Sequence, residues 1–403
     1  MDIKGIFEAF DGGNVFNLTT NKERSILFKA AGLTATTGQT LTEKIRNEMG
    51  KTNEYNEKIG WHPDFEYLDY GESENHYIVN VFADIQGSTN LVFKYDLETV
   101  KEIKSKILST AIEIFQAFDG NIHRLQGDAI FTYFGGKNQR ISDAIIDSLN
   151  AATILQVYIN EYLKEQFASL GIDPVKVRIG IDLGYEDDVL WSKYGIKNCS
   201  EITTTSLHTD LAAKMQSVCS VNKIMIGENV KVHLDLSEEL ISVKEKQVNG
   251  TRVKVPYIIK NDQFRYRMWH FDWQKYFQSF HLYVKNNILN DISLHCKADI
   301  DKNGLYSDEY ISNAQSLSKG VNLKFCISGL TNLYNTDVIW RVKNNGSESL
   351  EAGAIDFEMQ DYRGKIYCEQ STAYVGHHYM ECTVKRENQV LFHKFFGVYV
   401  NEA

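Results

Sequence analysis

The sequence predicts an α+β protein in which a ferredoxin-like domain is followed by a β-rich, β-sandwich-like C-terminal domain. First, strand-like runs and amphipathic helices alternate in the order β-α-β-β-α-β from residue 77 onward. Second, residues 121–136 indicate a hairpin that turns at a Gly-Asp pair. Third, short alternating runs separated by Asn and Gly turns dominate beyond residue 320. With 403 residues, the chain is long enough for two cores.

The elements are expected in the following order. Residues 1–75 combine a helical stretch around 24–50 with an aromatic, loop-like segment, which predicts an accessory N-terminal arm. In the next segment, residues 77–84 predict a strand, 97–118 a helix, and 121–136 the two strands of a hairpin. Residues 141–170 predict a long helix, 175–184 a strand, 206–217 a helix, and 223–227 a short strand. We place a Thr- and Ser-rich loop before the last of these helices. The expected domain bounds are 1–75 for the arm, 76–243 for the ferredoxin-like domain, 244–264 for a linker with a hairpin, and 265–403 for the β-rich domain.

The composition of the chain indicates its cellular compartment and excludes some classes of partner. There are 43 basic and 53 acidic residues, so the formal net charge is -10, which argues against a general binder of nucleic acid or anionic membranes. The N terminus lacks a secretory signal pattern, and no uncharged apolar run approaches about 18 residues. The six cysteines are far apart and form no CxxC pair, which favours reduced structural thiols. We therefore expect a cytoplasmic protein with no membrane span and no nucleic-acid partner.

Two carboxylates predict a metal site. Asp84 ends a strand-like run at a glycine turn, and Asp128 follows Gly127 at the hairpin corner. In a ferredoxin-like sheet, the strand that carries Asp84 lies beside this hairpin, so both carboxylates can reach one pair of cations. The backbone carbonyl of Ile85 is a further candidate ligand. Hard oxygen ligands favour two Mg²⁺ or Mn²⁺ ions, whereas the simpler interpretation of Asp84 is a helix or turn cap.

The residues around these carboxylates suggest a nucleotide substrate. The turn Gln86-Gly87-Ser88-Thr89 opens toward the helix expected near Leu97, and its backbone NH groups are candidates for binding phosphate, although such runs also cap helices. Three more candidates are less specific: Arg124, with five donors for a base or a carboxylate, and the pair Asp210 and Lys214, which has the spacing of an ordinary solvated helix pair.

Taken together, residues 76–240 resemble a class III nucleotidyl cyclase. The resemblance rests on FADIQGST, on the Gly-Asp hairpin, on VRIGIDLG and on TDLAAKMQS. It implies that Asp84 and Asp128 are metal ligands and that Arg124 and Thr203 occupy the two base-selecting positions. It also implies a head-to-tail homodimer with two sites, each completed by both subunits. In that family an Asn and an Arg orient the ribose and stabilise the transition state, and they correspond here to Asp210 and Lys214.

The departures from purine cyclases point to pyrimidines. Purine cyclases carry a Lys with an Asp, or a Glu with a Cys, where this chain has Arg124 and Thr203. This loss is shared with the bacterial anti-phage Pycsar cyclases, which make cyclic CMP or cyclic UMP and which the AAKMQ helix also resembles. Residues 265–403 resemble the AGS-C sensor domain through WRVKNNG, YRGKI and YVGHHYMEC. The resemblance implies anti-phage defence and a downstream cyclic-nucleotide-binding effector.

The expected reaction is attack of the 3′ hydroxyl of a nucleoside triphosphate on its own α phosphorus, with loss of pyrophosphate. Lys214 would offset charge on the α phosphoryl group. Arg124 has only donors and suits the adjacent acceptors O2 and N3 of cytosine better than uracil, while Thr203 can donate or accept and decides little. CTP is therefore favoured over UTP. The alternatives are an adenylate cyclase with unusual base contacts and a degenerate domain that binds nucleotide without turnover.

Overall fold

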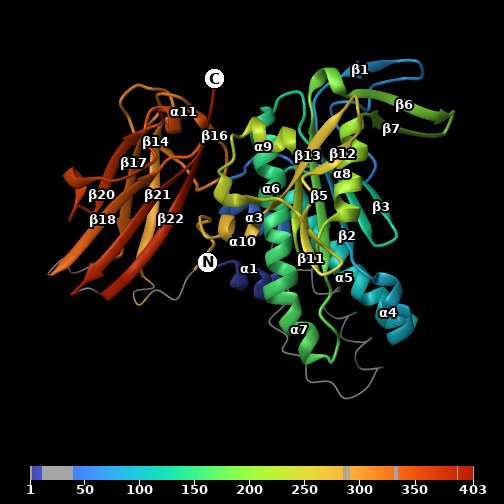
Figure 1. Ribbon diagram of the computed structural model, residues 1–403, viewed down its shortest axis with the longest axis horizontal. Coiled ribbons are helices and arrows are strands. Elements are labelled where there is room, and N and C mark those ends of the chain that lie inside the picture. The colour runs from blue at the N-terminus through green and yellow to red at the C-terminus, as the bar shows by residue number, and fades with distance from the viewer. Residues whose placement is uncertain are drawn as a thin grey trace. The chain divides into compact units, whose positions relative to one another are not determined.

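The computed structural model divides the chain into two compact units, which are described separately here (Figure 1). The structure describes residues 2–10, 40–284, 288, 291–330, 335–387 and 389–402. One unit comprises residues 3–230 and 242–273, and the other comprises residues 231–241 and 274–403. The helix expected around residues 24–50 falls largely outside the described residues. Of the helices in the described ranges, none is long and apolar enough to span a membrane.

The first unit is built on a mixed sheet with the strand order β12-β13-β8-β5-β2-β4-β3, with β9 also paired to β13. The order β5-β2-β4-β3 is that of a ferredoxin-like fold, which confirms the predicted fold class of this domain. In this sheet β2 runs antiparallel to both β4 and β5, and β5 runs parallel to β8. Its strands are β2 (Ile78–Ile85), β3 (Asn121–Gln126), β4 (Ala129–Phe134), β5 (Val177–Gly184), β8 (Ile224–Gly227), β9 (Ile241–Ser242), β12 (Tyr257–Lys260) and β13 (Arg265–Phe271).

Helices connect the strands of this sheet. Asp96 caps the N terminus of α5 (Leu97–Ala117) by accepting a hydrogen bond from Thr99 N. In Figure 1, α6 (Ile141–Val157) and α7 (Lys164–Ser169) form one long rod, joined by a π-helical turn over 158–163. A further helix, α8 (Leu207–Val218), packs against β5 at Gly180, where an added Cβ would lie 2.3 Å from the Ala212 carbonyl oxygen. This close approach fixes the position of α8 over the sheet.

One local prediction was incomplete and one was wrong. The helix expected from Leu97 is present as α5, but a further helix, α4 (Ser88–Lys94), was missed. It begins directly after Gly87, whose φ of 72° lets the chain turn from β2 into the helix. The expected Thr- and Ser-rich loop is a strand, β7 (Cys199–Thr205), paired with β6 (Leu190–Ile196), which also pairs with β1 (Ser73–Asn75). β-branched Thr side chains favour extended backbone once a partner strand is present, and this pairing is not visible in the local pattern.

The arm and the linker belong to this unit rather than standing apart from it. The arm contributes α1 (Ile3–Phe10) and α3 (Leu41–Glu48), and its Phe65 stacks on Trp191 with ring centroids 4.1 Å apart. The linker contains the predicted hairpin, β10 (Glu245–Val248) and β11 (Thr251–Lys254). Strands β12 and β13 follow this hairpin, and β13 pairs with β8, so both strands extend the sheet of the first unit. The sequence analysis instead placed β13 in the C-terminal domain, which was expected to begin at residue 265.

The second unit is a β-sandwich-like domain, as predicted. One sheet has the order β15-β14-β17-β20, and the other has the order β16-β22-β21-β18-β19. Buried side chains from both sheets, with Trp340 and Phe325 among the largest, form its core. The strands are β14 (Ser293–Asp299), β15 (Asp308–Glu309), β16 (Ser316–Ser318), β17 (Asn322–Ser328), β18 (Thr336–Lys343), β19 (Asp356–Glu358), β20 (Tyr367–Ser371), β21 (Gly376–Arg386) and β22 (Gln389–Asn401).

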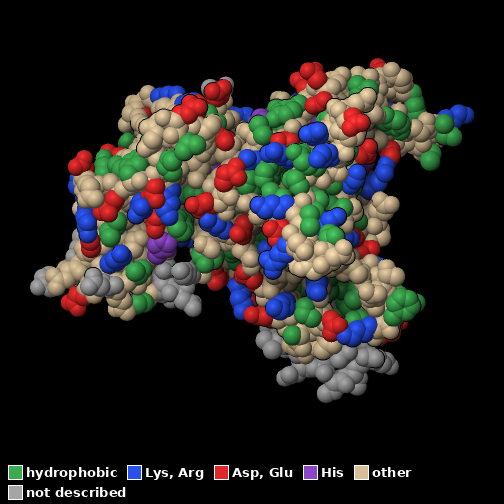
Figure 2. Space-filling view, viewed as in Figure 1, with side chains coloured by type: hydrophobic (Ala, Val, Ile, Leu, Met, Phe, Trp, Pro, Cys, Tyr) green, Lys and Arg blue, Asp and Glu red, His purple; other side chains and the backbone are tan. Residues whose placement is uncertain are grey.

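The remaining described helices are three short α-helices, α9 (Glu228–His233), α10 (Trp273–Phe277) and α11 (Ser347–Glu351), and three 3-10 turns at Glu186–Asp188, Glu238–Leu240 and Gln360–Tyr362. On the face shown in Figure 2, acidic and basic side chains are interspersed over the surface of each unit. The excess of acidic residues therefore does not gather into one large patch on that face.

Candidate active site

The two predicted metal-binding carboxylates lie side by side at one end of the sheet. The β2–β4 register places Asp84 opposite Ala129, the residue that follows Asp128. Both side chains are about one-fifth exposed, at 20% and 18%. Burial raises the pKa of Asp84, and the nearby Asp128 carboxylate raises it further, while Arg178 opposes the shift. The site therefore concentrates negative charge in a partly buried corner.

Asp84 is held by two side chains that the sequence analysis missed. Arg178 on β5 donates from Nη2 to Asp84 Oδ2 at 2.7 Å, and Gln216 on α8 donates to the same oxygen at 3.1 Å. Arg178 also donates to the Ser217 carbonyl oxygen at 2.8 Å. Within VRIGIDLG, Arg178 is the single cation and, with Asp182, one of two charged residues in a strand that is otherwise apolar, and this was the signal available in the sequence.

The Asp128 corner has its own cation. Gly127 has a φ of 68°, which lets the chain turn tightly between β3 and β4. Lys104 on α5 places its Nζ 3.7 Å from Asp128 Oδ1. Each carboxylate of the pair therefore faces one basic side chain as well as the other carboxylate.

The carboxylate pair fits a divalent cation. The two carboxylates repel each other electrostatically, and a bound divalent cation would remove that repulsion. Carboxylate oxygens are also the ligands that Mg²⁺ and Mn²⁺ favour. Over the described ranges no three or more His, Cys, Asp or Glu side chains are grouped so that they could hold a metal ion by themselves. A metal at Asp84 and Asp128 would therefore need backbone or substrate oxygens as further ligands. Ile85, whose carbonyl was predicted to be one, is the last residue of β2.

The phosphate-binding turn has the expected glycine geometry. Gly87 adopts a left-handed conformation and its carbonyl oxygen accepts from Asn90 N at 2.9 Å, within the first turn of α4. The neighbouring Gln86 and Thr89 are exposed, and Ser88 is half-buried. The predicted contact of this turn with phosphate stays a prediction.

The two predicted base-selecting residues lie on neighbouring elements. Arg124 on β3 forms a two-pronged ion pair with Glu201 on β7, with Nε donating to Oε2 at 3.0 Å and Nη2 donating to Oε1. Thr203 lies two residues after Glu201 on the same strand, and therefore on the same face. Its hydroxyl lies 3.1 Å from the hydroxyl of the buried Tyr133. Sequence reasoning missed both Glu201 and Tyr133.

Comparison with known proteins identifies the family. Residues 72–261 match the Adenylate and Guanylate cyclase catalytic domain, and residues 271–401 match the Adenylyl/Guanylyl and SMODS C-terminal sensor domain. A cytidylate cyclase of Staphylococcus aureus is 42% identical over 377 residues, which cover 90% of this chain and 88% of the relative. The chain belongs to this family of nucleotidyl cyclases.

Further matches are more distant. A cytidylate cyclase of Escherichia coli is 29% identical to this cyclase over 372 residues, covering 89% of this chain and 79% of the relative. A crystal structure of the adenylyl cyclase CyaB from P. aeruginosa aligns with a TM-score of 0.42 and 19% identity, over 50% of this chain and 95% of that one. The prediction of a class III cyclase domain followed by an AGS-C domain is confirmed.

Two predicted site residues of the cyclase are not brought to the carboxylate pair. Asp210 and Lys214 lie exposed on α8. In the described part of a single chain, neither has a hydrogen bond or an ion pair with Asp84 or Asp128. Gln216, on the same helix, is the residue that reaches Asp84.

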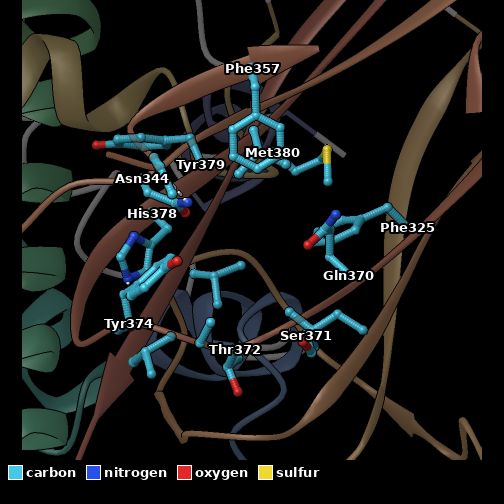
Figure 3. Close-up of a pocket in the computed structure, with 16 residues that line it drawn as sticks. Phe325, Asn344, Phe357, Gln370, Ser371, Thr372, Tyr374, His378, Tyr379 and Met380 are labelled. Atoms are coloured by element: carbon cyan, nitrogen blue, oxygen red, sulfur yellow. Dashed lines mark hydrogen bonds between the residues drawn. The ribbon is translucent and has the colours of Figure 1, made fainter. Parts of the chain in front are cut away.

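The second unit of the cyclase contains a cavity of about 200 Å³ between its two sheets (Figure 3). Figure 3 shows the amide of Gln370 directed into it, and this amide donates to Met359 Sδ at 3.1 Å. None of the lining residues is Asp, Glu, Lys or Arg. Burial lowers the pKa of His378 to about 4, so this lining histidine is neutral at pH 7. The cavity is lined by Leu323, Phe325, Val342, Asn344, Ala354, Phe357, Gln370, Ser371, Thr372, Ala373, Tyr374, His378, Tyr379, Met380, Val398 and Val400.

Proposed function

We propose that the chain converts CTP to 3′,5′-cyclic CMP and pyrophosphate. The observation that carries this proposal is the adjacent pair Asp84 and Asp128, which has the chemistry of a metal–triphosphate site. It is supported by the relatives from S. aureus and E. coli, both of which are named cytidylate cyclases. Two divalent ions, Mg²⁺ or Mn²⁺, would polarise the attacking 3′ hydroxyl and neutralise triphosphate oxygens when bound.

The residues around the pair would provide charge and orientation. Asp84 and Asp128 would hold the ions, with the Ile85 carbonyl and the turn at Gly87 beside them. Arg178 is already within 2.7 Å of Asp84, so its guanidinium is available to a triphosphate oxygen once the carboxylate binds metal instead. Lys104 provides a second positive charge near Asp128. Most of the catalysis would therefore be positioning and electrostatic stabilisation.

Base selection would depend on Arg124 and Thr203. The pairing of Arg124 with Glu201 fixes the guanidinium through two of its five N–H groups and leaves the others for a ligand. Those donors suit the O2 and N3 acceptors of cytosine. Uracil presents a donor at N3, so one of these contacts would be lost with UTP.

The complete site would need two subunits. Asp210 and Lys214 are exposed on α8 and make no contact with the carboxylates of their own described chain. In a head-to-tail homodimer, they would reach the ribose and the α phosphate bound by Asp84 and Asp128 of the other subunit. A lysine offers a point charge where the family's arginine offers a fork, so it would neutralise the phosphoryl group without holding two oxygens.

The cellular role that we infer is signalling in bacterial anti-phage defence of the Pycsar type. In this role a cytoplasmic cyclase releases cyclic CMP to an effector that binds cyclic nucleotides. The bounds that we propose for its parts are 1–75, 76–243, 244–264 and 265–403, with β12 and β13 added to the catalytic sheet.

The proposal is tested with purified full-length protein and Mn²⁺, to which ATP, GTP, CTP and UTP are offered separately. Mass spectrometry identifies each product. Cyclic CMP as the main product is the expected result, and Asp84→Ala protein is the control for contaminating activity. A main product from ATP, GTP or UTP would overturn the CTP assignment, and binding without any product would favour the degenerate alternative.

A further inference from the structure

Thr203 is the end of a row of hydrogen-bonded side chains that begins at a buried amide. Its hydroxyl lies 3.1 Å from Tyr133 OH, which lies 3.2 Å from the Thr204 hydroxyl. Thr204 Oγ1 is in turn 3.0 Å from Thr209 Oγ1, and Thr209 donates to Asn80 Oδ1 at 2.9 Å. Four hydroxyl groups, called the hydroxyl relay below, thus connect the predicted base-selecting position to the middle of the sheet.

The relay is built from four elements of the first unit and is shielded from water at its inner end. Asn80 on β2 and Tyr133 on β4 are directly opposed in the sheet register. They are 0% and 1% exposed. Thr209 comes from α8, and the other two threonines come from β7. Bulk water does not reach Asn80 or Tyr133, so the hydrogen bonds that they form are set by the protein. Asn80 Oδ1 has Thr209 as its partner, whereas Asn80 Nδ2 has none among the described residues.

The relay has a direction because each hydroxyl has only one hydrogen. A carbonyl oxygen can only accept, so Thr209 gives its hydrogen to Asn80. Thr204 must then donate to Thr209, and Tyr133 must donate to Thr204. Burial raises the pKa of Tyr133, so this hydroxyl keeps its hydrogen at neutral pH. The remaining bond requires Thr203 to donate to Tyr133.

A consequence follows for the open side of Thr203. Its single hydrogen is used inward, so a ligand meets only the lone pairs of its oxygen. The ambiguity of a threonine hydroxyl, which in general donates or accepts, is thereby removed at this position.

We propose that the hydroxyl relay makes Thr203 a hydrogen-bond acceptor and thereby selects cytosine over uracil. The proposal rests on the proposed function, in which Thr203 faces the pyrimidine. Cytosine has an amino donor at position 4, whereas uracil has a carbonyl acceptor there. An acceptor at Thr203 bonds the amino group and meets the uracil carbonyl with lone pairs on both atoms. Tyr133 and Thr209 are then positioning residues that act through Thr203.

The test is the ratio of kcat/KM for CTP to that for UTP, measured on full-length protein with Mn²⁺. Thr209→Val keeps the shape of the side chain but removes the hydroxyl that fixes the direction of the relay. We expect the ratio to fall about three- to tenfold, the range of one neutral hydrogen bond. Tyr133→Phe should lower it similarly, and Thr209→Ser, which restores the hydroxyl, should keep the wild-type ratio.

The matched control is Thr205→Val, which removes a hydroxyl of the same strand that bonds to Tyr194 outside the relay. It should leave the ratio unchanged. Wild-type preference for CTP together with an unchanged ratio in Thr209→Val would overturn the relay while leaving the proposed function intact. A higher ratio would mean that the relay runs the other way and that Thr203 donates, which also overturns the proposal. Wild-type preference for another nucleotide would instead overturn the proposed function.

Discussion

The corner formed by Asp84 and Asp128 and the cavity of the second unit are opposite kinds of site. The corner contains two partly buried carboxylates, each with a basic neighbour. The cavity contains aromatic rings, amides and a neutral histidine, with no formal charge in its lining. The two units are therefore suited to different ligands: the charged corner to a charged ligand such as a nucleotide, and the cavity to an uncharged molecule or none.

The largest expected effect comes from removing the charge of the corner. Asp84→Ala and Asp128→Ala should each lower kcat by at least about a thousandfold, because metal stabilisation is worth several kcal/mol and about 1.4 kcal/mol is tenfold. Cyclic nucleotide formation in Mn²⁺ measures this. The control is Asp187→Ala, which removes an exposed carboxylate and should leave kcat unchanged. Substantial product from either Asp variant would exclude the two-metal site.

Mixed dimers would show whether the corner is completed by a second chain. Asp84→Ala and Lys214→Ala should each be inactive alone, but a co-expressed heterodimer should recover about half of the wild-type activity through its one intact site. Differently tagged chains and two-step purification verify the heterodimer. No recovery in that verified species would place Lys214 and Asp84 of one chain in the same site.

Arg124, paired with Glu201, is the predicted selector of the base. Arg124→Ala should reduce the preference for the best triphosphate by about ten- to a hundredfold, since it removes charge-assisted hydrogen bonds worth about 1.5 to 3 kcal/mol. The readout is kcat/KM for all four nucleotides, and the exposed Arg252→Ala is the matched control. If all four rates fell equally, Arg124 would belong with the phosphates.

His378, the neutral histidine of the cavity, should make the stability of the second unit depend on pH. Its folded pKa of about 4 lies below the unfolded value near 6.5, so protonation favours the unfolded chain. The stabilisation is complete above about pH 6.5 and is lost as the pH falls toward 4, by up to about 3 kcal/mol. Denaturant unfolding at pH 7.5 and 5 should therefore show a smaller decline in His378→Gln than in the wild type. An equal decline would assign the effect to other groups.

The smallest expected effect is an absence of change. CTP bound with Ca²⁺ to wild-type protein should slow amide exchange in β2 and α8, but not in the cavity strands β20 and β21. A cavity lined by no Lys or Arg has nothing to neutralise a triphosphate. Hydrogen exchange with mass spectrometry measures both regions in one experiment. Protection centred on β20 and β21 would mean that the contrast between the two sites is wrong.

The sequence was sufficient to predict those site residues whose positions follow from the order of strands and turns along the chain. Asp84 and Asp128 each stand at a strand end beside a glycine, so the sheet order alone brings them together. The partners of these residues depend on registers that join distant segments, and they were missed: Arg178 pairs with Asp84 through β2 and β5, and Glu201 meets Arg124 across 77 residues. Thr203 was found but was given no preference, because the direction of its hydrogen bond depends on Asn80 and Thr209, which no local pattern connects to it.

The stacked rings of Phe65 and Trp191 affect where this cyclase can be truncated for experiments. The match to the catalytic family begins at residue 72, after Phe65, yet this ring shares a buried cluster with Trp191, Tyr133 and Ile202. A chain trimmed to the family boundary would uncover Trp191 and loosen the strand that carries Thr203. Such a fragment could retain metal-dependent turnover and still misreport which pyrimidine the full-length protein uses.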